Sequence, residues 1–426
     1  MSIAIGIDFG TTNSSIARVN EAGGVDLVQF EFQGQLTDAY RSLLYMEQHR
    51  EQGRVTLKSW SGPGGVEQYL ASDVKGRLTQ SLKSFLSSRT FKTTEVFGRP
   101  RTLEELIARI LEDLRHQAGQ KFGSVIRRAV VGRPVRFVGA EAEADDDFAL
   151  ARLRQAFTLA GFERVDFQLE PVAAARWYES KLDHRELILI GDFGGGTSDF
   201  SLIRAGPRVP RHRRLLGNAG VGLAGDAFDA KIVRHVVSPA LGAGTHWRSL
   251  GKVLPVPKWI YASLERWHHL SFLKNKDVSS TLHSVRAQAD EPGKIEALIE
   301  LVREDLGYPL HRAVQQTKCA LSMHSAAEFR FSQAGVELEA SVTRADFEGW
   351  IAEELASLAQ CVDGLVASAG VKASDIDGVF LTGGTSFVPA VRRIFASRFG
   401  EARIQSGHEF TSVARGLALQ ASMPAD

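Results

Sequence analysis

The sequence has few cysteines and no long apolar run. Cys319 and Cys361 are its two cysteines among 426 residues. This is too few for a disulfide framework and is typical of a reducing compartment. No apolar run approaches the roughly 18 residues that a membrane-spanning helix needs. The first residues enter an expected strand at once, without the basic and apolar regions of a secretory leader. We therefore expect a soluble, cytoplasmic protein without a membrane partner.

An excess of charge of one sign is also lacking. The chain has 51 Lys and Arg against 50 Asp and Glu, a formal net charge of +1. No whole-molecule field therefore favours nucleic acid as a partner. The arginine-rich run between Arg204 and Arg214 has no interleaved aromatic residues, so we interpret it as a solvated loop. A hydrophobic fraction of 44% is ordinary for a globular protein, and the length allows two or more domains.

One sequence pattern occurs twice. Residues 5–13 read Ile-Gly-Ile-Asp-Phe-Gly-Thr-Thr-Asn, and residues 190–199 read Ile-Gly-Asp-Phe-Gly-Gly-Gly-Thr-Ser-Asp. Each copy is a short apolar strand that runs into a carboxylate, Asp8 or Asp192. A turn rich in glycine and threonine follows, and then a second β-like stretch. This order predicts a β-hairpin whose turn exposes backbone N–H groups. Two such hairpins predict two related lobes that face each other.

The paired turns predict a nucleotide site. Two opposed amide-rich turns can bind a polyphosphate from both sides, and two aspartates can hold its divalent cation through water. Mg²⁺ keeps several waters and needs only one or two carboxylates besides phosphate oxygens, so Asp8 and Asp192 suffice. An aspartate at such a position could instead cap the N–H groups of its own turn. Glycines let the backbone approach phosphates closely. The candidates are Gly10, Gly194, Gly195 and Gly196.

Strands alternate with helical stretches along the chain, which predicts an α/β architecture. We place lobe I at residues 1–186, completed by a C-terminal helix within 407–426, and lobe II at 187–406. Residues 34–100 are expected to form an inserted subdomain of lobe I, and about 230–310 a mostly helical insertion in lobe II. Helices are expected at 102–118, 147–160, 172–178, 295–306, 312–323, 389–399 and 413–421, and strands at 125–131, 162–169 and from 379 to a glycine turn.

Five motifs follow one another from the first strand to the last helix. They are Ile5 to Ser14, Val130 to Phe137 with Leu169 to Ala175, Asp192 to Phe200, Leu381 to Ser386, and Ser412 to Ala418. In this order they resemble the nucleotide-binding domain of the heat-shock seventy (DnaK-type) chaperones, in particular a YegD-like branch that lacks the C-terminal substrate-binding domain. The resemblance implies a two-lobed, actin-like ATPase fold with duplicated ribonuclease-H-like lobes and inserted subdomains. It also implies ATP or ADP with Mg²⁺ as cofactors.

The resemblance further assigns roles at the phosphate end of the site. The implied metal residues are Asp8, Asp192 and Asp199. The implied phosphate-binding residues of the first turn are Gly10, Thr11, Thr12 and Asn13. The implied catalytic residues are Glu170, Lys83, Thr197 and Asp192, with Lys83 reaching the γ-phosphate and Glu170 and Thr197 placing the attacking water. Read alone, Glu170 is an acid favoured at a helix start, and Lys83 could equally be a solvated helix lysine.

At the adenosine end the chain departs from the family pattern. Lys318 and Ser322 lie four apart on an expected helix and share a face. The resemblance puts both on the adenosine, with Gly383 and Gly384 under the ribose. Four positions differ from the family: Gln315, Cys319 and Phe387 replace Glu, Arg and Arg, and Phe410 replaces Asp. Because charged partners around the base are lost, we expect weaker or altered base recognition.

The main hypothesis is an ATP-binding, Mg²⁺-dependent, chaperone-type ATPase of the stress response, with slow hydrolysis and lobes that close over nucleotide. We expect a monomer that binds a protein partner through an inserted subdomain. One alternative is a sugar-type kinase of the same fold, although no general-base aspartate occurs in a recognisable context. The other is a non-catalytic, actin-like scaffold. Fold alone does not choose among these functions.

Overall fold

The structure is a computed structural model and describes residues 4–51, 54–74, 76–207, 209, 215–249, 251–265, 273, 276–406 and 411–423. These residues belong to two compact units. Unit 1 comprises Met1–Ala224, Ser357–Ser386 and Arg392–Asp426, and unit 2 comprises Gly225–Ala356 and Phe387–Val391. The lobe boundary expected at residues 186 and 187 falls inside unit 1 and stays a prediction. Phe410 and most of the arginine-rich run lie outside the described residues.

The first sheet of unit 1 begins with the hairpin predicted from residues 5–13. Five of its six strands lie in the order β13-β12-β1-β2-β3, and the sixth, β6, pairs with β2. Strand β1 is antiparallel to β2 and parallel to β12, which is parallel to β13. The bounds are β1 Ala4–Phe9, β2 Asn13–Val19, β3 Val25–Leu27, β6 Tyr40–Arg41, β12 Arg128–Arg133 and β13 Arg164–Leu169.

The second sheet of unit 1 repeats this arrangement. Its strands lie in the order β16-β15-β14-β21-β22, with β14 antiparallel to β15 and parallel to β21. The bounds are β14 Glu186–Phe193, β15 Ser198–Ala205, β16 Leu215–Val221, β21 Gly378–Thr382 and β22 Ile404–Ser406. The α/β class and the duplicated architecture are therefore confirmed.

Helix α2 (Leu103–Phe122) covers the first sheet and shows how local sequence sets its bounds. At its start, Glu105 N–H donates to Thr102 Oγ1 and Thr102 N–H donates to Glu105 Oε2, at 3.2 and 2.9 Å. This reciprocal pair satisfies two N–H groups that a helix start leaves free. Gly123 ends the helix with a φ of 62°, a conformation that glycine adopts without strain. The apolar face predicted from the spacing is buried, and α3 (Glu143–Leu159) shares its core.

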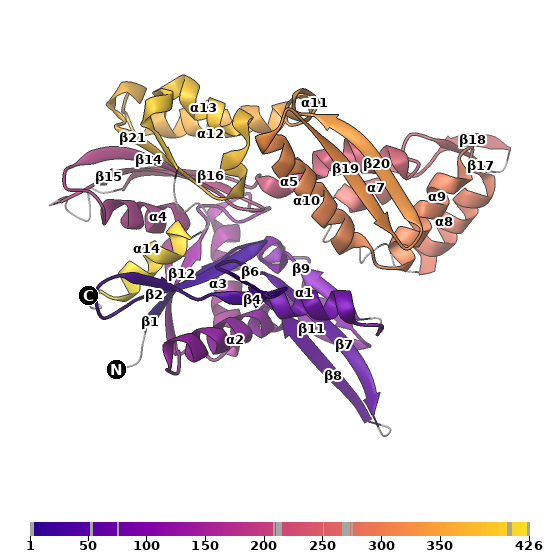
Figure 1. Cartoon of the computed structure of the whole chain (residues 1–426), viewed down its shortest axis with the longest axis horizontal. Helices are drawn as coiled ribbons and strands as arrows, with labels where there is room; N and C mark the ends of the chain where they lie inside the picture. Colours follow the sequence, from indigo (N-terminus) through magenta and orange to yellow (C-terminus); the bar gives the residue numbers. More distant parts are fainter. Residues whose placement is uncertain are drawn as a thin grey trace. The chain divides into compact units, whose positions relative to one another are not determined.

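Two further helices of unit 1 cross at backbone contact. Helix α4 (Glu170–Glu179) follows β13, and α14 (Ser412–Ala421) follows β22. A Cβ added at Gly416 would lie 1.7 Å from Ala173 O, and one at Gly6 would lie 2.3 Å from Ala418 N. Helix α14 can therefore lie against both β1 and α4 (Figure 1) because the contact positions carry no side chain.

Residues 34–100 contain a separate three-stranded sheet in the order β8-β7-β9. The long β7–β8 hairpin extends from it (Figure 1), and most of β8 is exposed. The 3₁₀ helix η1 (Leu82–Phe85) follows β9 and carries Lys83. The other bounds of this region are β4 Phe30–Phe32, β5 Gln35–Thr37, β7 Leu43–Glu51, β8 Arg54–Ser61, α1 Gly62–Ala71, β9 Arg77–Gln80, β10 Thr93–Val96 and β11 Arg99–Thr102.

The described part of unit 2 is mostly helical, with two hairpins. Neither hairpin, β17–β18 or β19–β20, was expected from the sequence. The bounds are α5 Gly225–Ile232, α6 Ser238–Ala240, β17 His246–Ser249, β18 Lys252–Pro255, α7 Lys258–Glu265, α8 Lys276–Gln288, α9 Pro292–Arg303, α10 Gly307–Met323, β19 Ala326–Gln333, β20 Val336–Thr343 and α11 Arg344–Trp350. Helix α12 (Ala352–Ser368) then leads from unit 2 back to unit 1, and α13 (Pro389–Phe399) follows β21.

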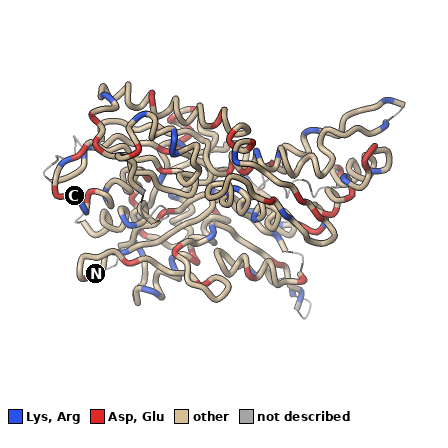
Figure 2. Tube along the Cα trace, turned by 45° about the horizontal axis from the view of Figure 1, so that its top comes forward, with Lys and Arg blue, Asp and Glu red and all other residues tan. Residues whose placement is uncertain are grey.

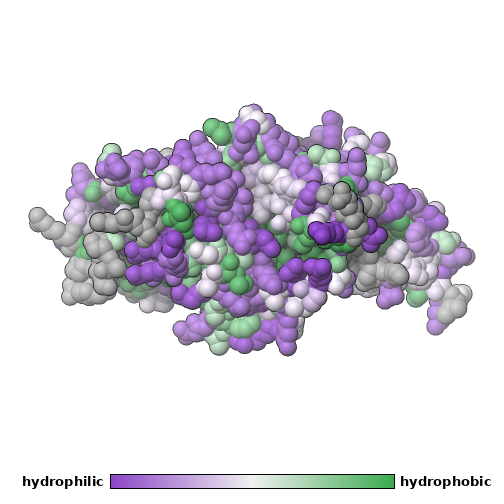
Figure 3. All heavy atoms as spheres, turned by 90° about the horizontal axis from the view of Figure 1, so that it is seen from below, coloured by the Kyte–Doolittle hydropathy of each residue, from purple (hydrophilic) through white to green (hydrophobic). Residues whose placement is uncertain are grey.

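The surface carries mixed charges. Basic and acidic residues are interspersed along the drawn trace in Figure 2. On the face shown in Figure 3 hydrophilic residues predominate, and hydrophobic residues gather only in small separate patches. Within the described part of the chain, no helix has the length and apolar character required to cross a bilayer.

Candidate functional site

The two predicted turns occupy the same place in the two sheets of unit 1. In the first hairpin the pairing register sets Asp8 opposite Ser15. In the second it sets Asp192 opposite Asp199. Each strand therefore brings its aspartate to the end next to the turn, as the repeated sequence pattern predicts.

The two turns also lie close to each other. Gly196, in the second turn, lies beside the first: a Cβ there would be 3.5 Å from Thr11 Oγ1. It would also lie 2.7 Å from Val138 Cγ2 and 3.6 Å from Ser84 Oγ. Any residue larger than glycine would therefore collide with Val138 and occupy the space beside Thr11. The two turns, the loop after β12 and the η1 segment all meet at this point.

A buried ion pair lies at the same place. Lys83 Nζ is 2.7 Å from Glu170 Oε1, and each residue is 7% exposed. Glu170 is the first residue of α4, and Pro171 follows it at a position where proline needs no N–H partner. Lys83 is therefore not a solvated helix lysine, and Glu170 does more than complement a helix dipole.

Three aspartates surround this ion pair. Loss of water around the carboxyls, followed by the charge of Glu170, raises the pKa of Asp8 to about 7 and that of Asp199 to about 7. The same two causes, together with Asp8 and Asp199, raise the pKa of Asp192 well above its ordinary value. Burial disfavours the Lys83 ammonium, but the negative charges of Glu170, Asp8 and Asp199 outweigh it and raise the pKa of Lys83. The cluster thus holds more negative than positive charge.

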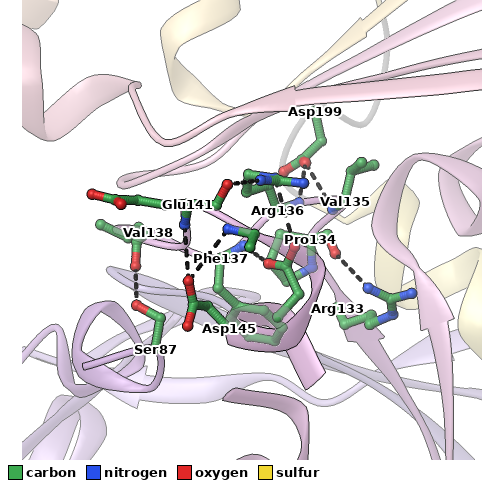
Figure 4. Close-up of polar contacts among 12 residues, drawn as sticks. Ser87, Arg133, Pro134, Val135, Arg136, Phe137, Val138, Glu141, Asp145 and Asp199 are labelled. Carbon is green, nitrogen blue, oxygen red and sulfur yellow. Dashed lines mark hydrogen bonds and ion pairs between the residues drawn. The ribbon is translucent and has the colours of Figure 1, made fainter. Parts of the chain in front are cut away.

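Asp199 has backbone partners that the sequence did not reveal. Its Oδ1 accepts hydrogen bonds from Val135 N–H at 2.7 Å and Arg136 N–H at 3.4 Å. Figure 4 shows this loop between Asp199 on one side and Ser87, whose hydroxyl donates to Val138 O, on the other. Asp199 is 1% exposed, so the second sheet is joined here to the loop that follows β12. The only sequence signal was the Arg-Pro motif that ends that strand.

The residues present fit a magnesium phosphate group. Four carboxylates and one ammonium leave an excess of negative charge that a divalent cation would offset. Thr12 Oγ1 is buried and has no hydrogen-bond partner among the described residues, and Thr11 is 8% exposed. Within the described ranges, no three His, Cys, Asp or Glu side chains lie close enough to hold an ion directly. Coordination largely through water, with one or two carboxylates, is the usual arrangement for Mg²⁺.

Other predicted phosphate residues lie in the two turns. Asn13 begins β2, and its Oδ1 accepts a hydrogen bond from Arg41 at 3.3 Å. In the second turn, Gly194 N–H donates to Thr197 O at 2.9 Å, which closes that turn. The individual roles of Gly10, Asn13, Gly194, Gly195 and Thr197 stay predictions.

The predicted adenosine residues divide between the two units. Lys318 and Ser322 lie on α10 in unit 2, where Lys318 Nζ is 2.7 Å from Asp229 Oδ1 and donates to Gly225 O at 3.1 Å. Ser322 Oγ donates to Lys318 O at 3.2 Å. Phe387, also in unit 2, is 48% exposed and so is not a core aromatic.

Gly383 and Gly384 belong to unit 1, in the turn after β21. Gly383 has a φ of 85°, and a Cβ there would lie 2.0 Å from Phe193 O. Only glycine fits this turn against the end of β14. Whether these glycines meet the adenosine residues of unit 2 around a nucleotide stays a prediction.

The duplicated sheets and their facing turns define the actin-like ATPase fold. The family model described as "Hsp70 protein" matches residues 71–242 and 299–425, and the chain belongs to the Hsp70 family. Members of this family bind ATP or ADP with Mg²⁺.

Several chaperones align along almost the whole chain. It is 27% identical to the chaperone protein DnaK of Deinococcus deserti over 99% of its length and 60% of that protein. It is 26% identical to DnaK of Deinococcus radiodurans over the same shares, and 25% identical to DnaK of Thermosipho africanus over 98% of this chain and 58% of that protein. The chain thus spans about 60% of the length of the curated relatives it matches.

Proposed function

We propose that the chain binds Mg·ATP at the paired turns and hydrolyses it slowly, as a chaperone-type ATPase whose lobes close over the nucleotide. The observation that carries this proposal is the buried Lys83–Glu170 ion pair, at 2.7 Å, beside the turns that bear Asp8 and Asp192. A buried, net negative cluster next to two glycine-rich turns suits a cation and a polyphosphate. We place the protein in the cytoplasm, where its two cysteines would stay reduced and free.

In this proposal Lys83 and Glu170 act on the terminal phosphate and its attacking water. An ammonium has three N–H donors, so Lys83 can keep Glu170 as a partner and still donate to a γ-phosphate oxygen. Its positive charge would offset the charge spread over that group in the transition state. The second oxygen of the Glu170 carboxylate can accept from water, and Thr197 would complete the orientation of that water. A bound Mg²⁺, held near Asp8, Asp192 and Asp199, would supply further neutralisation of phosphate charge.

The remaining residues would position the nucleotide. Backbone N–H groups of the two turns and the Thr11 and Thr12 hydroxyls would bind phosphate oxygens. Lys318 would contact the adenosine while sharing its ammonium with Asp229. Since Phe387 and Cys319 are neutral and accessible to solvent, we propose that base recognition relies on stacking more than on charge.

Calorimetry tests the proposal directly. Mg·ATP, Mg·ADP and Mg·AMP are titrated into the protein, and phosphate release from Mg·ATP is followed separately. We expect binding of ATP and ADP, weak or no binding of AMP, and slow phosphate release. The absence of binding by both ATP and ADP at millimolar concentrations would contradict the proposal.

We also propose that a protein partner binds one of the inserted regions in a nucleotide-dependent way. In unit 2, Val253 of β18 is 62% exposed and Trp259 of α7 is 48% exposed, so apolar contact surface is available there. Pull-down with Mg·ATP, Mg·ADP or no nucleotide tests this. Partners recovered equally in all three conditions would argue against nucleotide gating.

A further inference from the structure

Arg152, on α3, is a buried arginine that the site described above does not use. It is 7% exposed, and its Nε forms an ion pair with Glu104 Oε1 of α2. The rest of its guanidinium is directed at backbone carbonyls. The acceptors are Phe85 O at 3.3 Å, Leu86 O at 3.4 Å and Ser88 O at 3.1 Å for Nη1, and Phe91 O at 3.1 Å for Nη2.

These four carbonyls belong to one segment, residues 85–91, which begins two residues after Lys83. Within it the backbone makes only short turn bonds, such as Leu86 N–H to Lys83 O at 3.2 Å and Ser88 N–H to Phe85 O at 3.1 Å. Arg152 therefore supplies long-range partners for the backbone carbonyls of this stretch. The side chains of Ser87 and Arg89 also bind outside it, to Val138 O and Asp145. A planar guanidinium offers five donors in fixed directions, so its bonds determine where the carbonyls lie.

The 3₁₀ helix η1, which carries Lys83 and leads into residues 85–91, begins after a residue in an unfavourable conformation. Ser81, the residue before η1, has φ 53° and ψ 31° and is completely buried. This left-handed region is uncommon for residues other than glycine. Such a conformation persists only where the surroundings hold it in place. Contacts made by the residues that follow η1 are therefore needed to hold Ser81 and η1 in this conformation.

We propose that Arg152 is a positioning residue for Lys83. By binding the carbonyls of residues 85–91, and through its ion pair with Glu104, it fixes the backbone from which the flexible lysine reaches Glu170. The inference rests on the proposed function, since it concerns the lysine assigned to the γ-phosphate. The polar contacts of Arg152 are with Glu104 and with the carbonyls of residues 85–91, and not with Glu170 or an aspartate of the cluster. Arg152 therefore acts through the backbone that carries Lys83.

The first test compares Arg152→Lys with Arg154→Lys. Arg154 is a matched control because it lies on the same helix and also binds a backbone carbonyl, Val165 O at 2.8 Å, away from residues 85–91. We expect Arg152→Lys to slow single-turnover ATP hydrolysis about 10- to 100-fold, as small misplacements of a reacting group do. Affinity for Mg·ADP should be unchanged, because ADP has no γ-phosphate for Lys83 to reach. Arg154→Lys should change neither quantity.

The second test needs no turnover. An amine-reactive acylating reagent is applied to the full chain, and modification of individual lysines is quantified by mass spectrometry. Lys231, paired with Glu354 at 2.9 Å and 12% exposed, is the internal control. We expect labelling of Lys83 to rise several-fold in Arg152→Lys, with Lys231 unchanged, and no rise in Arg154→Lys. If Arg152→Lys does not fold, Glu104→Gln should produce a smaller rise at Lys83 alone.

The outcomes separate the inference from the proposed function. Unchanged Lys83 labelling and turnover in Arg152→Lys would overturn the positioning role. A joint rise at Lys83 and Lys231 would also overturn it, because it would show general unfolding. If the wild type neither binds nor hydrolyses ATP, the proposed function fails, while the labelling still decides whether Arg152 holds Lys83.

Discussion

Five strands in each of the two sheets of unit 1 share the same order and direction, yet the sheets differ at two corresponding positions. Opposite the aspartate at the first turn lies Ser15, whereas opposite the aspartate at the second lies Asp199. At the start of the helix that follows the fifth strand, the acid lies in the first half and the hydroxyl in the second. Helix α4 starts with Glu170, whereas α14 starts with Ser412, whose hydroxyl is 2.8 Å from Thr382 Oγ1.

Each half therefore contributes one acid where the other half has a hydroxyl. A fully symmetric molecule would have two, four or six carboxylates at these positions, and with four both additional acids would come from the same kind of position in the two halves. Six would repel one another in a site that is already poor in water, which raises carboxyl pKa values. Two would leave the ammonium with fewer partners. The comparison teaches that duplication provides the scaffold, and that divergence at equivalent positions distributes the charge.

The largest effect is expected from removing the acid particular to the first half. Glu170→Ala should abolish measurable turnover, since loss of a water-orienting group typically lowers the rate about 10²- to 10⁴-fold. Nucleotide binding should persist, as measured by calorimetry with Mg·ADP. Glu163→Ala, which removes an exposed glutamate paired with Arg127, is the control. Normal turnover in Glu170→Ala would remove its assignment.

Making the first hairpin resemble the second should destabilise the fold. Ser15 is 2% exposed, and its hydroxyl has no partner among the described residues. Ser15→Asp would bury a charge beside Asp8 without a cation, and an uncompensated buried charge costs about 3–5 kcal/mol. Urea denaturation without nucleotide measures this loss. Ser15→Asn separates charge from volume; an equal loss in both variants would refute the electrostatic explanation.

The reverse exchange, Asp199→Ser, should act on the cation more than on the fold. It removes the acceptor for Val135 and Arg136 N–H and one carboxylate near the site. Losing such a supporting group typically lowers metal affinity about 10- to 100-fold. Mg²⁺ titration of ATP binding measures the change. An unaltered Mg²⁺ requirement would exclude Asp199 from the metal site.

The smallest effect is expected at the start of α14. Ser412→Ala removes the hydrogen bond to Thr382, and the unfolding free energy should fall by about 1 kcal/mol. Turnover should be unchanged, in contrast to Glu170→Ala at the equivalent position of the first half. Denaturation and phosphate release are measured on the same preparation. A loss of turnover as large as that of Glu170→Ala would show that the two helix starts are functionally alike.

Much of the scaffold could be predicted because its signals are local. The repeated aspartate turns, the apolar spacing of α2 and the Glu-Pro start of α4 each specify an element within a few residues. The strand expected from Val125 begins only at Arg128, since Val125 is 62% exposed and lies outside the pairing. Hairpin β17–β18 was missed because its strands are largely exposed and so lack an alternating apolar pattern.

Parts of the site could not be predicted for a different reason. The bonds from Val135 and Arg136 to Asp199 use backbone N–H groups, which every residue other than proline possesses, so no residue type marks them. Likewise, the four carbonyls that Arg152 binds have no sequence signature. The ion pair of Lys83 with Glu170 joins residues 87 positions apart, and only the family resemblance pointed to it.

The contact between Gly6 and Ala418 has a consequence for synthesis of the protein. Strand β1 leaves the ribosome early, but the helix that covers it is made more than four hundred residues later. Pairing over such a sequence distance is slow to form. During translation the face of the first sheet that α14 covers therefore stays exposed until α14 has been made. A chain interrupted before α14 would keep that face open to other molecules.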